Sequence, residues 1–466
     1  MRDFFNDYVQ TIETYIMFRI KETVAKITPE LTAKGRAPIA LSMGAPTAAP
    51  PQKVTDDLKN ALGEKGINLY STPKGEKYFR DAVAERMKTR FNVELNPDDE
   101  IFSLIGSKEG IANLIRILIN PTTKNEDKDI IWVPDPGYAS YKEMINVSGG
   151  LAYSIPLKAE DNYLPDLNKV YESFISEGYN PKKIKAILIN YPNNPIGATA
   201  THEYMRHVVD FCKKHNILLV SDAAYTDMYF KPELKPMSVL EIEGAKDIAV
   251  EFFSFSKPYA MTGWRLGWIC GNKTAVQLFG KLKSTLDSGL FKALQKAGAE
   301  ILNSQEGEEY IKKSNVIFKH NQELLIKGLK EELGWGNFYV PDATFYLWLP
   351  IPPRYKSSVD FTNDLMHKSG IIAVPGDAFG KYGEGYFRVS IVCPEAQIKE
   401  EMAVLEQYLP KKLSEEELTE RLKTIIANVG ATSMKDMGAV MKQAKAEFGV
   451  TADGKMINEV VKKLLA

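Results

Sequence analysis

The most chemically suggestive feature of the sequence is a lysine that follows two serines and precedes an arginine. The run FSFSK contains Ser254 and Ser256 and ends in Lys257, and Arg265 lies a short way beyond it. A lysine amine can form a Schiff base with an aldehyde. Hydroxyl groups and a guanidinium are what a phosphate attached to that aldehyde needs. The spacing therefore predicts covalent chemistry with a phosphorylated aldehyde cofactor, and an exposed lysine in a serine-rich loop is the alternative.

A carboxylate stands at the end of a buried-strand pattern. The apolar residues 217–220 lead into Asp222, and Tyr225 follows shortly afterwards. A carboxylate at that point can pair with a protonated pyridine nitrogen, and this pairing makes the ring an electron sink. Asp222 can equally be a helix cap that uses its side-chain oxygen. From the residues alone both interpretations stay open.

Two turns supply further polar groups. Residues 190–197, NYPNNPIG, follow the apolar run KAILI and predict a rigid turn that aims the amide of Asn194, although a purely local turn explains the same composition. The run EIFSLIG leads into Ser107 and Lys108 and then into an apolar-periodic helix. Such a helix N-terminus has free amides and suits an anion, whereas Ser107 as a simple helix cap is the alternative.

These motifs lie where β-rich runs alternate with helical stretches, from about residue 98 to 271. Strand alternating with helix predicts parallel pairing with right-handed crossovers, and hence an α/β sheet covered on both faces. The carboxyl ends of its strands should form the edge that holds the site. A long helical region is predicted over 273–332. A mixed segment over 334–409 contains the strand-like runs FYLWL, IIAVPG and FRVSIV.

The C-terminal residues predict a separate helical unit. Ser414 with Glu417, and Ser433 with Asp436, have the spacing of capping boxes that each open a short helix. A last helix is predicted through INEVVKKLL, and the most linker-like stretch is LPKKL around Pro410.

Composition narrows the class of protein. The chain has 466 residues, 44% hydrophobic and 26% charged, which predicts ordinary globular folding. Its 59 basic residues nearly balance 60 acidic ones, so nucleic acid or a membrane surface is not the expected partner. The widely spaced Cys212, Cys270 and Cys393 indicate neither a disulfide framework nor a metal site. With no apolar run of membrane-spanning length, we expect a cytoplasmic protein that acts on a small polar substrate.

Together these motifs resemble the class I/II aminotransferase family of pyridoxal-phosphate enzymes, which has the aspartate-aminotransferase-like fold, fold type I. The resemblance covers about residues 15–410. It implies a large cofactor-binding domain with a mostly parallel sheet, a smaller α+β domain and a C-terminal helical appendix. The expected divisions are 1–49 for an N-terminal arm with part of the small domain, 50–300 for the large domain, 301–410 for the small domain and 411–466 for the appendix.

Roles of individual residues follow from the resemblance. Lys257 would be the Schiff-base lysine and proton shuttle, Asp222 would hold the pyridine nitrogen, and Tyr225 would complete the catalytic set. Arg388, in YFRVS, would bind the substrate carboxylate with help from Asn194 and the backbone at Gly44. The remaining implied cofactor contacts are Tyr225 and Asn194 at the ring hydroxyl, Tyr138 on the ring face, Ser107, Lys108, Ser254 and Arg265 at the phosphate, and Tyr70 from a neighbouring subunit.

The implied reaction is transfer of an amino group between an amino acid and a 2-oxo acid, with glutamate and 2-oxoglutarate as one pair. The Tyr70 match implies a homodimer with shared sites. A β-eliminating lyase of the same fold would keep Lys257, Asp222 and Arg388, and a noncatalytic tRNA-associated protein is a third hypothesis. The motifs GSKEGI and DPGY are closest to the branch of LL-diaminopimelate, alanine and glutamate transaminases. The plant and chlamydial diaminopimelate enzymes carry a glutamate where this chain has Pro73-Lys74, so the substrate stays open.

Residues 419–466, with MKDMG and ADGKM, resemble the small helical domain shared by YqeY-like proteins and the tail of a tRNA-dependent amidotransferase subunit. The resemblance implies a link to tRNA. The basic excess of this segment is slight, so a protein-docking or passive role is the alternative.

Overall fold

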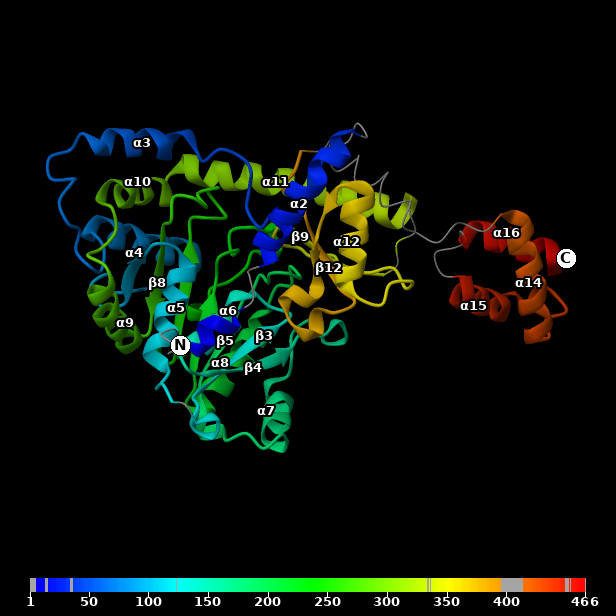
Figure 1. The fold of residues 1–466 in the computed structure, drawn as a ribbon, viewed down its shortest axis with the longest axis horizontal. Coiled ribbons are helices and arrows are strands. Elements are labelled where there is room, and N and C mark those ends of the chain that lie inside the picture. The colour runs from blue at the N-terminus through cyan, green and yellow to red at the C-terminus, as the bar shows by residue number, and fades with distance from the viewer. Residues whose placement is uncertain are drawn as a thin grey trace, which may run out of the picture. The chain divides into compact units, whose positions relative to one another are not determined.

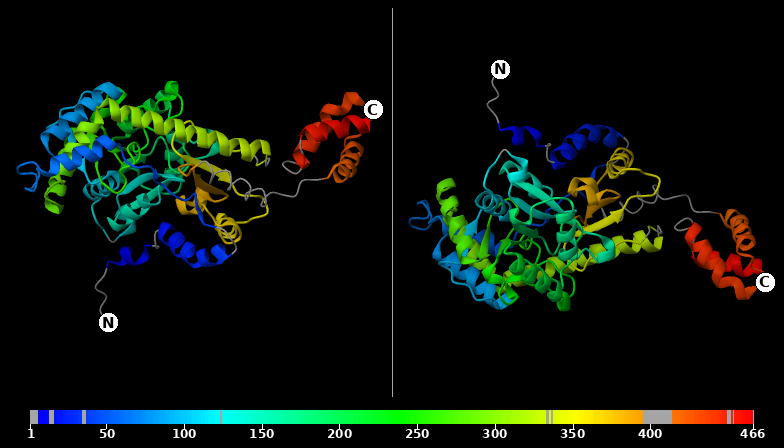
Figure 2. Two further views of the ribbon diagram at one scale, coloured as in Figure 1. Left: turned by 90° about the horizontal axis from the view of Figure 1, so that it is seen from above. Right: turned by 90° about the horizontal axis from the view of Figure 1, so that it is seen from below.

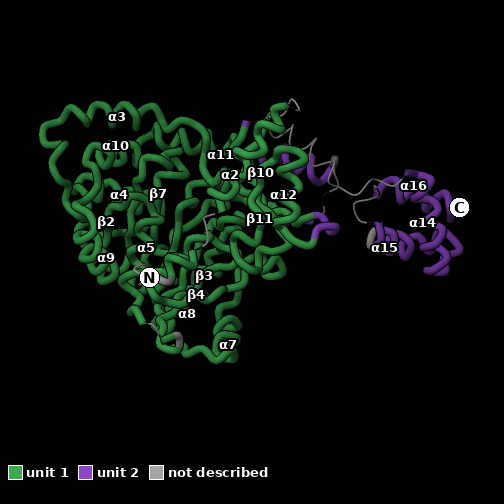
Figure 3. The backbone as a smooth tube through the Cα atoms, viewed as in Figure 1, with its two compact units in different colours: residues 1–319, 339–351, 356–393 green, residues 320–338, 352–355, 394–466 purple. Residues whose placement is uncertain are grey.

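The chain separates into two units in the computed structural model (Figure 3). Unit 1 comprises residues 1–319, 339–351 and 356–393, and unit 2 comprises 320–338, 352–355 and 394–466. The structure describes residues 6–12, 16–33, 37–122, 124–332, 335, 337–394, 414–448, 452 and 454–465. Pro410 and its predicted linker lie outside the described residues.

A seven-stranded sheet forms the centre of unit 1 (Figure 1). Its order is β2-β8-β7-β6-β5-β3-β4, and only β8 runs against its neighbours. The predicted mostly parallel α/β sheet is therefore confirmed. The strands are β2 (Ile101–Leu104), β3 (Ile130–Asp135), β4 (Leu151–Pro156), β5 (Ile184–Ile189), β6 (Leu218–Asp222), β7 (Ala249–Ser254) and β8 (Gly267–Gly271).

Helices cover both faces of this sheet because successive strand residues point to opposite sides. In β3, Ile130 and Trp132 join one buried apolar cluster, while Ile131 and Val133 join another. The helices α4 (Lys77–Phe91), α7 (Leu167–Ser176), α8 (His202–His215) and α10 (Lys292–Leu302) contribute to the first cluster. The helices α5 (Ser107–Leu118), α6 (Ser140–Val147) and α9 (Lys273–Leu286) contribute to the second.

Two smaller sheets complete unit 1. The antiparallel order β11-β12-β9 places Arg388 opposite Trp348, and β1 pairs with β10 in parallel. Apolar residues of α2 pack with Met366 of α12 and Ile372 of β10, so α2 and α12 lie side by side (Figure 2). These elements are β1 (Ile39–Ala40), β9 (Tyr346–Pro350), β10 (Ile371–Ile372), β11 (Val374–Pro375), β12 (Tyr386–Ser390), α2 (Ile16–Ala33) and α12 (Ser358–Ser369).

The predicted helical region after residue 272 is confirmed as α9, α10 and α11 (Gln305–Lys327), with breaks between them. The helices α1 (Asp7–Thr11) and α3 (Gln52–Leu62) lie earlier in the chain. The domain boundaries expected at 49/50 and 300/301 stay predictions. No helix in the described part of the chain is long and apolar enough to span a membrane.

Three helices of unit 2 bury their own apolar core. They are α14 (Glu415–Val429), α15 (Met437–Phe448) and α16 (Gly454–Leu465). Both predicted capping boxes form, because the side chains of Glu417 and Asp436 accept from the backbone of Ser414 and Ser433. The second box opens the 3₁₀ turn η11 (Met434–Asp436), which runs directly into α15.

Candidate active site

The carboxyl ends of the parallel strands meet at one edge of the large sheet, as the strand-helix alternation predicts. A cavity of about 510 Å³ opens there. The predicted site residues that line it are Gly44, Ser107, Lys108, Tyr138, Asn194, Asp222, Tyr225, Ser254, Lys257, Arg265 and Arg388. Residues from opposite ends of the chain therefore converge on one space.

Lys257 follows β7 and points into this cavity. Its Nζ donates a hydrogen bond to the backbone oxygen of Gly44. Burial lowers the pKa of Lys257 to about 8, and the nearby Arg388 and Arg265 act in the same direction while Asp222 opposes them. A substantial share of this amine is therefore neutral near pH 8. The exposed-loop alternative for Lys257 is wrong.

Asp222 is the last residue of β6, and its two carboxylate oxygens have different surroundings. Oδ2 accepts a hydrogen bond of 2.7 Å from the hydroxyl of Tyr141, whereas Oδ1 has no partner among the described residues. Burial raises the pKa of Asp222 to about 6, and the hydrogen bond from Tyr141 acts against that rise. A turn rather than a helix follows Asp222, so the helix-cap alternative is wrong.

The turn after β5 is fixed to the neighbouring strand. Asn190 donates from Nδ2 to the backbone oxygen of Asp222 at 2.7 Å, and its Oδ1 accepts from the amide of Asn194 at 2.9 Å. Asn194 in turn accepts at Oδ1 from Nη1 of Arg388 at 2.8 Å. The predicted rigid turn is confirmed, and it aims the side chain of Asn194 at the arginine.

Arg388 is buried in β12 and held from several sides. Its Nη2 donates to the backbone oxygen of Ser42 at 2.9 Å. Its guanidinium carbon lies 4.4 Å from the ring centre of Tyr346, whose hydroxyl is 3.1 Å from that of Tyr225. The Nε of Arg388 has no hydrogen-bond partner in the described part of the chain. A planar carboxylate can therefore approach a preoriented guanidinium.

Hydrogen-bond donors surround the start of α5 and form a concave group, here called the cup, that consists of Ser107, Lys108, Ser254 and Arg265. The helix begins at Ser107, but its N-cap is Gly106, so Ser107 as a helix cap is wrong. Gly106 has φ +102°, and the guanidinium of Arg265 occupies the space that a Cβ would need. The same guanidinium donates to the backbone oxygen of Thr262 at 3.0 Å. Lys108 lies with its Nζ 5.6 Å from the ring centre of Tyr138.

Tyr70 is placed apart from the other predicted residues. Its side chain is 85% exposed in the single chain, and it does not line the cavity. Its predicted contact with a neighbouring subunit stays a prediction.

Several cavity residues were missed by sequence reasoning, namely Tyr141, Thr262 and Tyr346, and Asn190 was included only as part of the predicted turn. Tyr141 lies three residues after the predicted Tyr138, in the first turn of α6, and its nearness in the sequence was a usable signal. Tyr346 had no such signal, because its contact with Tyr225 spans 121 residues of sequence.

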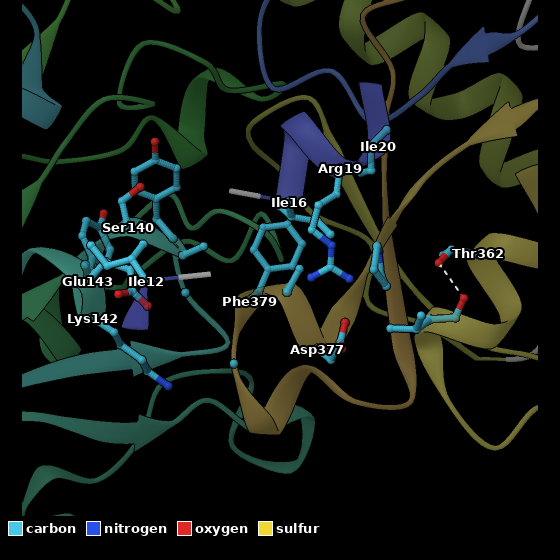
Figure 4. A pocket seen from close by; sticks show the side chains of 18 of the residues that line it. Ile12, Ile16, Arg19, Ile20, Ser140, Lys142, Glu143, Thr362, Asp377 and Phe379 are labelled. Carbon is cyan, nitrogen blue, oxygen red and sulfur yellow. Dashed lines mark hydrogen bonds between the residues drawn. The ribbon is translucent and has the colours of Figure 1, made fainter. Parts of the chain in front are cut away.

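A second cavity of about 610 Å³ adjoins the first and shares Lys108, Tyr138 and Tyr141 with it. It is lined by residues of α1, α2, α6 and α12 and by the segment from Ala373 to Gly380, which includes Pro375 of β11. In Figure 4, the side chain of Arg19 from α2 extends toward Asp377. The second cavity therefore offers charged groups of both signs beyond the first.

A family model described as aminotransferase class I and II matches residues 36–405. The chain belongs to the aminotransferase class I and II family. It is a pyridoxal-phosphate-dependent aminotransferase, so it transfers amino groups between amino acids and 2-oxo acids. A second model, described as Yqey-like protein, matches residues 394–465, which confirms the resemblance of the C-terminal helices.

Individual proteins support the family assignment. LL-diaminopimelate aminotransferase of Aquifex aeolicus is 39% identical to this aminotransferase over 85% of the chain and 97% of that protein. A substrate-bound BacF structure from Bacillus subtilis has a TM-score of 0.79 and 29% identity, and the match covers 87% of this chain and 98% of that one. Aspartate aminotransferase from Thermus thermophilus with maleate has a TM-score of 0.77 and 25% identity, covering 88% and 100%. The predicted fold type is thereby confirmed.

Proposed function

We propose that the cavity of unit 1 binds pyridoxal 5'-phosphate, with Lys257 as the lysine that holds its aldehyde and then moves the substrate's α-proton. The observation that carries this proposal is that one cavity holds both a partly buried lysine, whose pKa is lowered to about 8, and a buried carboxylate that keeps one oxygen unpartnered in the described structure. When bound, the cofactor supplies an aldehyde that captures amino groups and a ring that accepts electrons.

The surroundings of Asp222 fit a pyridine nitrogen. Tyr141 occupies Oδ2, and Oδ1 remains for a donor such as a pyridinium N–H. A cation at that position would lower the pKa of Asp222 from about 6 and hold the carboxylate ionised. Tyr225 and Asn194 line the same cavity and supply hydroxyl and amide groups for the ring oxygen, and Tyr138 supplies a ring for stacking.

The cup at α5 fits a phosphate. Ser107, Lys108, Ser254 and Arg265 bring two hydroxyls and two cations, and the backbone amides at the start of α5 can add donors. Gly106 supports this role, because any side chain there would displace the guanidinium of Arg265.

Arg388 is proposed to bind the α-carboxylate of the substrate. Its guanidinium is buried and oriented by Asn194 and Ser42, and Gly44 lies beside it. Holding the carboxylate there positions the α-carbon within the cavity that Lys257 enters. The neutral amine of Lys257 then accepts the α-proton and delivers it to another atom, because its lowered pKa allows both proton uptake and release near neutrality.

The substrate class is proposed from the second cavity together with the relatives. Glutamate and 2-oxoglutarate form one expected pair. The other amino acid is proposed to carry a distal polar or charged end, as LL-diaminopimelate does for the named relatives. Arg19, Glu143 and Asp377 line the adjoining cavity and can meet a distal carboxylate or ammonium.

A homodimer is proposed on the basis of an exposed apolar surface around Tyr70. Leu69, Tyr70, Leu286 and Phe291 are all between 49% and 85% exposed in the single chain. The segments of Tyr70 and Phe291 are adjacent, since Nζ of Lys292 donates to the backbone oxygen of Gly66 and Nε2 of Gln295 donates to the hydroxyl of Ser71. Large apolar patches of this kind favour association.

The cytoplasm is the proposed compartment, and a tRNA or protein partner for the C-terminal helices stays a hypothesis.

The test is a spectroscopic titration of the purified holoprotein with a panel of amino acids, including glutamate, alanine, aspartate and diaminopimelate. We expect glutamate and one further amino acid to convert the cofactor to its aminated form, and the matching 2-oxo acid to reverse the change. Release of ammonia and pyruvate in place of this reversible conversion would favour the β-eliminating lyase. A cofactor spectrum that no amino acid changes would favour a noncatalytic protein.

A further inference from the structure

A fully buried lysine outside the cavity makes two ion pairs. Lys283 lies near the end of α9, and its side chain is 0% exposed. Its Nζ is 3.1 Å from Oε1 of Glu109 and 2.6 Å from Oδ2 of Asp287. Lys283 does not line the cofactor cavity. Its partners are partly exposed, Glu109 at 19% and Asp287 at 35%. Removing the ammonium would leave these two carboxylates without the cation that they share, so breaking the contact should have a measurable effect.

Glu109 brings negative charge close to the proposed phosphate cup. It lies in the first turn of α5, directly after Ser107 and Lys108, which line the cavity. Its Oε2 accepts from the amide of Ile105 at 3.3 Å, so the carboxylate also ties the helix to the end of β2. A carboxylate at this helix end competes with a second anion there, because both interact with the same positive end of the helix. Its pairing with Lys283 offsets that competition.

Asp287 extends the contact to the segment next to Tyr70. Its Oδ1 accepts from the amide of Gly289 at 2.9 Å. Gly289 has φ +95° and packs so closely on the backbone of Thr72 that a Cβ would lie 2.6 Å from its oxygen. One buried ammonium is therefore shared between the helix that opens the phosphate cup and a loop packed on the Tyr70 segment.

We infer that Lys283 is a positioning residue for the cofactor phosphate. It neutralises the carboxylate of Glu109 in the first turn of α5, and it acts on the phosphate only by offsetting this charge. The inference rests on the proposed cofactor site. It predicts a selective effect, because a change in the field at α5 alters the binding of a phosphorylated ligand far more than the binding of the same ring without phosphate.

The test compares pyridoxal 5'-phosphate with pyridoxal, which has the same ring and aldehyde but no phosphate, on the full chain freed of cofactor. In Lys283→Met we expect affinity for pyridoxal phosphate to fall about tenfold or more, as for loss of one charge-assisted contact. Pyridoxal affinity should stay within about twofold of the parent value. The matched control is Lys273→Met, which removes an exposed partner of Asp99 from the same helix and should change neither affinity.

A second substitution separates charge from general damage. Adding Glu109→Gln to Lys283→Met should restore most of the preference for the phosphorylated ligand, because the uncompensated carboxylate is then gone. Glu109→Gln alone should keep or raise that preference, so this variant tests the inference even where Lys283→Met does not fold. Equal loss of both affinities in Lys283→Met, no recovery in the double variant, or a lowered preference in Glu109→Gln would each overturn the inference. A parent protein that binds the two ligands equally would instead overturn the proposed phosphate cup.

Discussion

Replacing Tyr141 with phenylalanine should move the titration of Asp222 and slow the enzyme at neutral pH. The substitution keeps the ring, which is buried, and removes the hydroxyl that donates to Oδ2 at 2.7 Å. A hydrogen bond to a charged group contributes roughly 1.5–3 kcal/mol. One pKa unit corresponds to about 1.4 kcal/mol, so the pKa of Asp222 should rise by about one to two units.

The direction follows from the causes of the shift. Burial already raises the pKa of Asp222 from 3.8 to about 6, and Tyr141 limits the rise. In the cofactor-free protein the free energy of unfolding falls as the pH rises from about 4 to about 6, because Asp222 keeps its proton to a higher pH in the folded state than in the unfolded state. In Tyr141→Phe that window should extend upward past neutrality. In the cofactor-free variant the carboxylate would then be mostly protonated at pH 7, so it would have to lose that proton before it could pair with a protonated ring nitrogen, and the pairing would be weaker by the same free energy.

The assay is the pH dependence of kcat/KM together with a pH titration of the cofactor absorbance. We expect the acid limb to move up by about one unit or more and the rate at pH 7 to fall about tenfold. Tyr153→Phe is the matched control, because its hydroxyl also faces a carboxylate, that of Glu177 at 3.3 Å, but on the surface away from the site. An unmoved acid limb in Tyr141→Phe, with the parent rate at pH 7, would refute the reasoning.

Three further outcomes are expected. Arg388→Lys should raise KM for amino and 2-oxo acids by about tenfold or more with a smaller change in kcat, because an ammonium cannot make the planar two-point contact; an unchanged KM would place the carboxylate site elsewhere. Tyr70→Phe should weaken cofactor retention. Mixing Tyr70→Phe chains with Lys257→Ala chains should give hybrid dimers that recover activity if the two subunits share their sites. Activity equal to the sum of the two separate variants would refute sharing. A chain ending at residue 410 should keep its turnover within a few-fold of the full chain, which corresponds to about 1 kcal/mol or less of activation free energy, and should melt at a modestly lower temperature. A collapse of turnover with the cofactor still bound would show that the C-terminal helices help build the site.

The sequence predicted the parts of the site that sit at strand ends. Lys257 and Asp222 follow apolar runs, and the carboxyl ends of parallel strands share an edge, so their convergence follows from local patterns. Arg388 was found only through family resemblance, because its strand belongs to a different sheet. The capping boxes of the C-terminal helices could also be predicted from local sequence, because each depends on four neighbouring residues.

Long-range contacts account for most of what the sequence did not predict. Tyr346 and Lys283 reach the site or its support across more than a hundred residues, and no local pattern distinguishes them from core positions. β8 was not predicted as a strand, and it runs antiparallel because residues 255–266 return to the sheet without a crossover helix. Its short run GWICG also has glycine at both ends, which weakens a strand pattern.

The central claim is that Lys257 holds the cofactor. Treating the holoprotein with sodium borohydride should fix the reducible bond between the cofactor and its lysine, and peptide mapping then identifies the labelled residue. Two lysines line the cavity in the described structure, Lys257 and Lys108, so the experiment discriminates within the site itself. We predict a single labelled peptide that carries the cofactor on Lys257 and is absent when the cofactor is removed beforehand. A label on Lys108 or on a lysine outside the cavity would contradict the assignment.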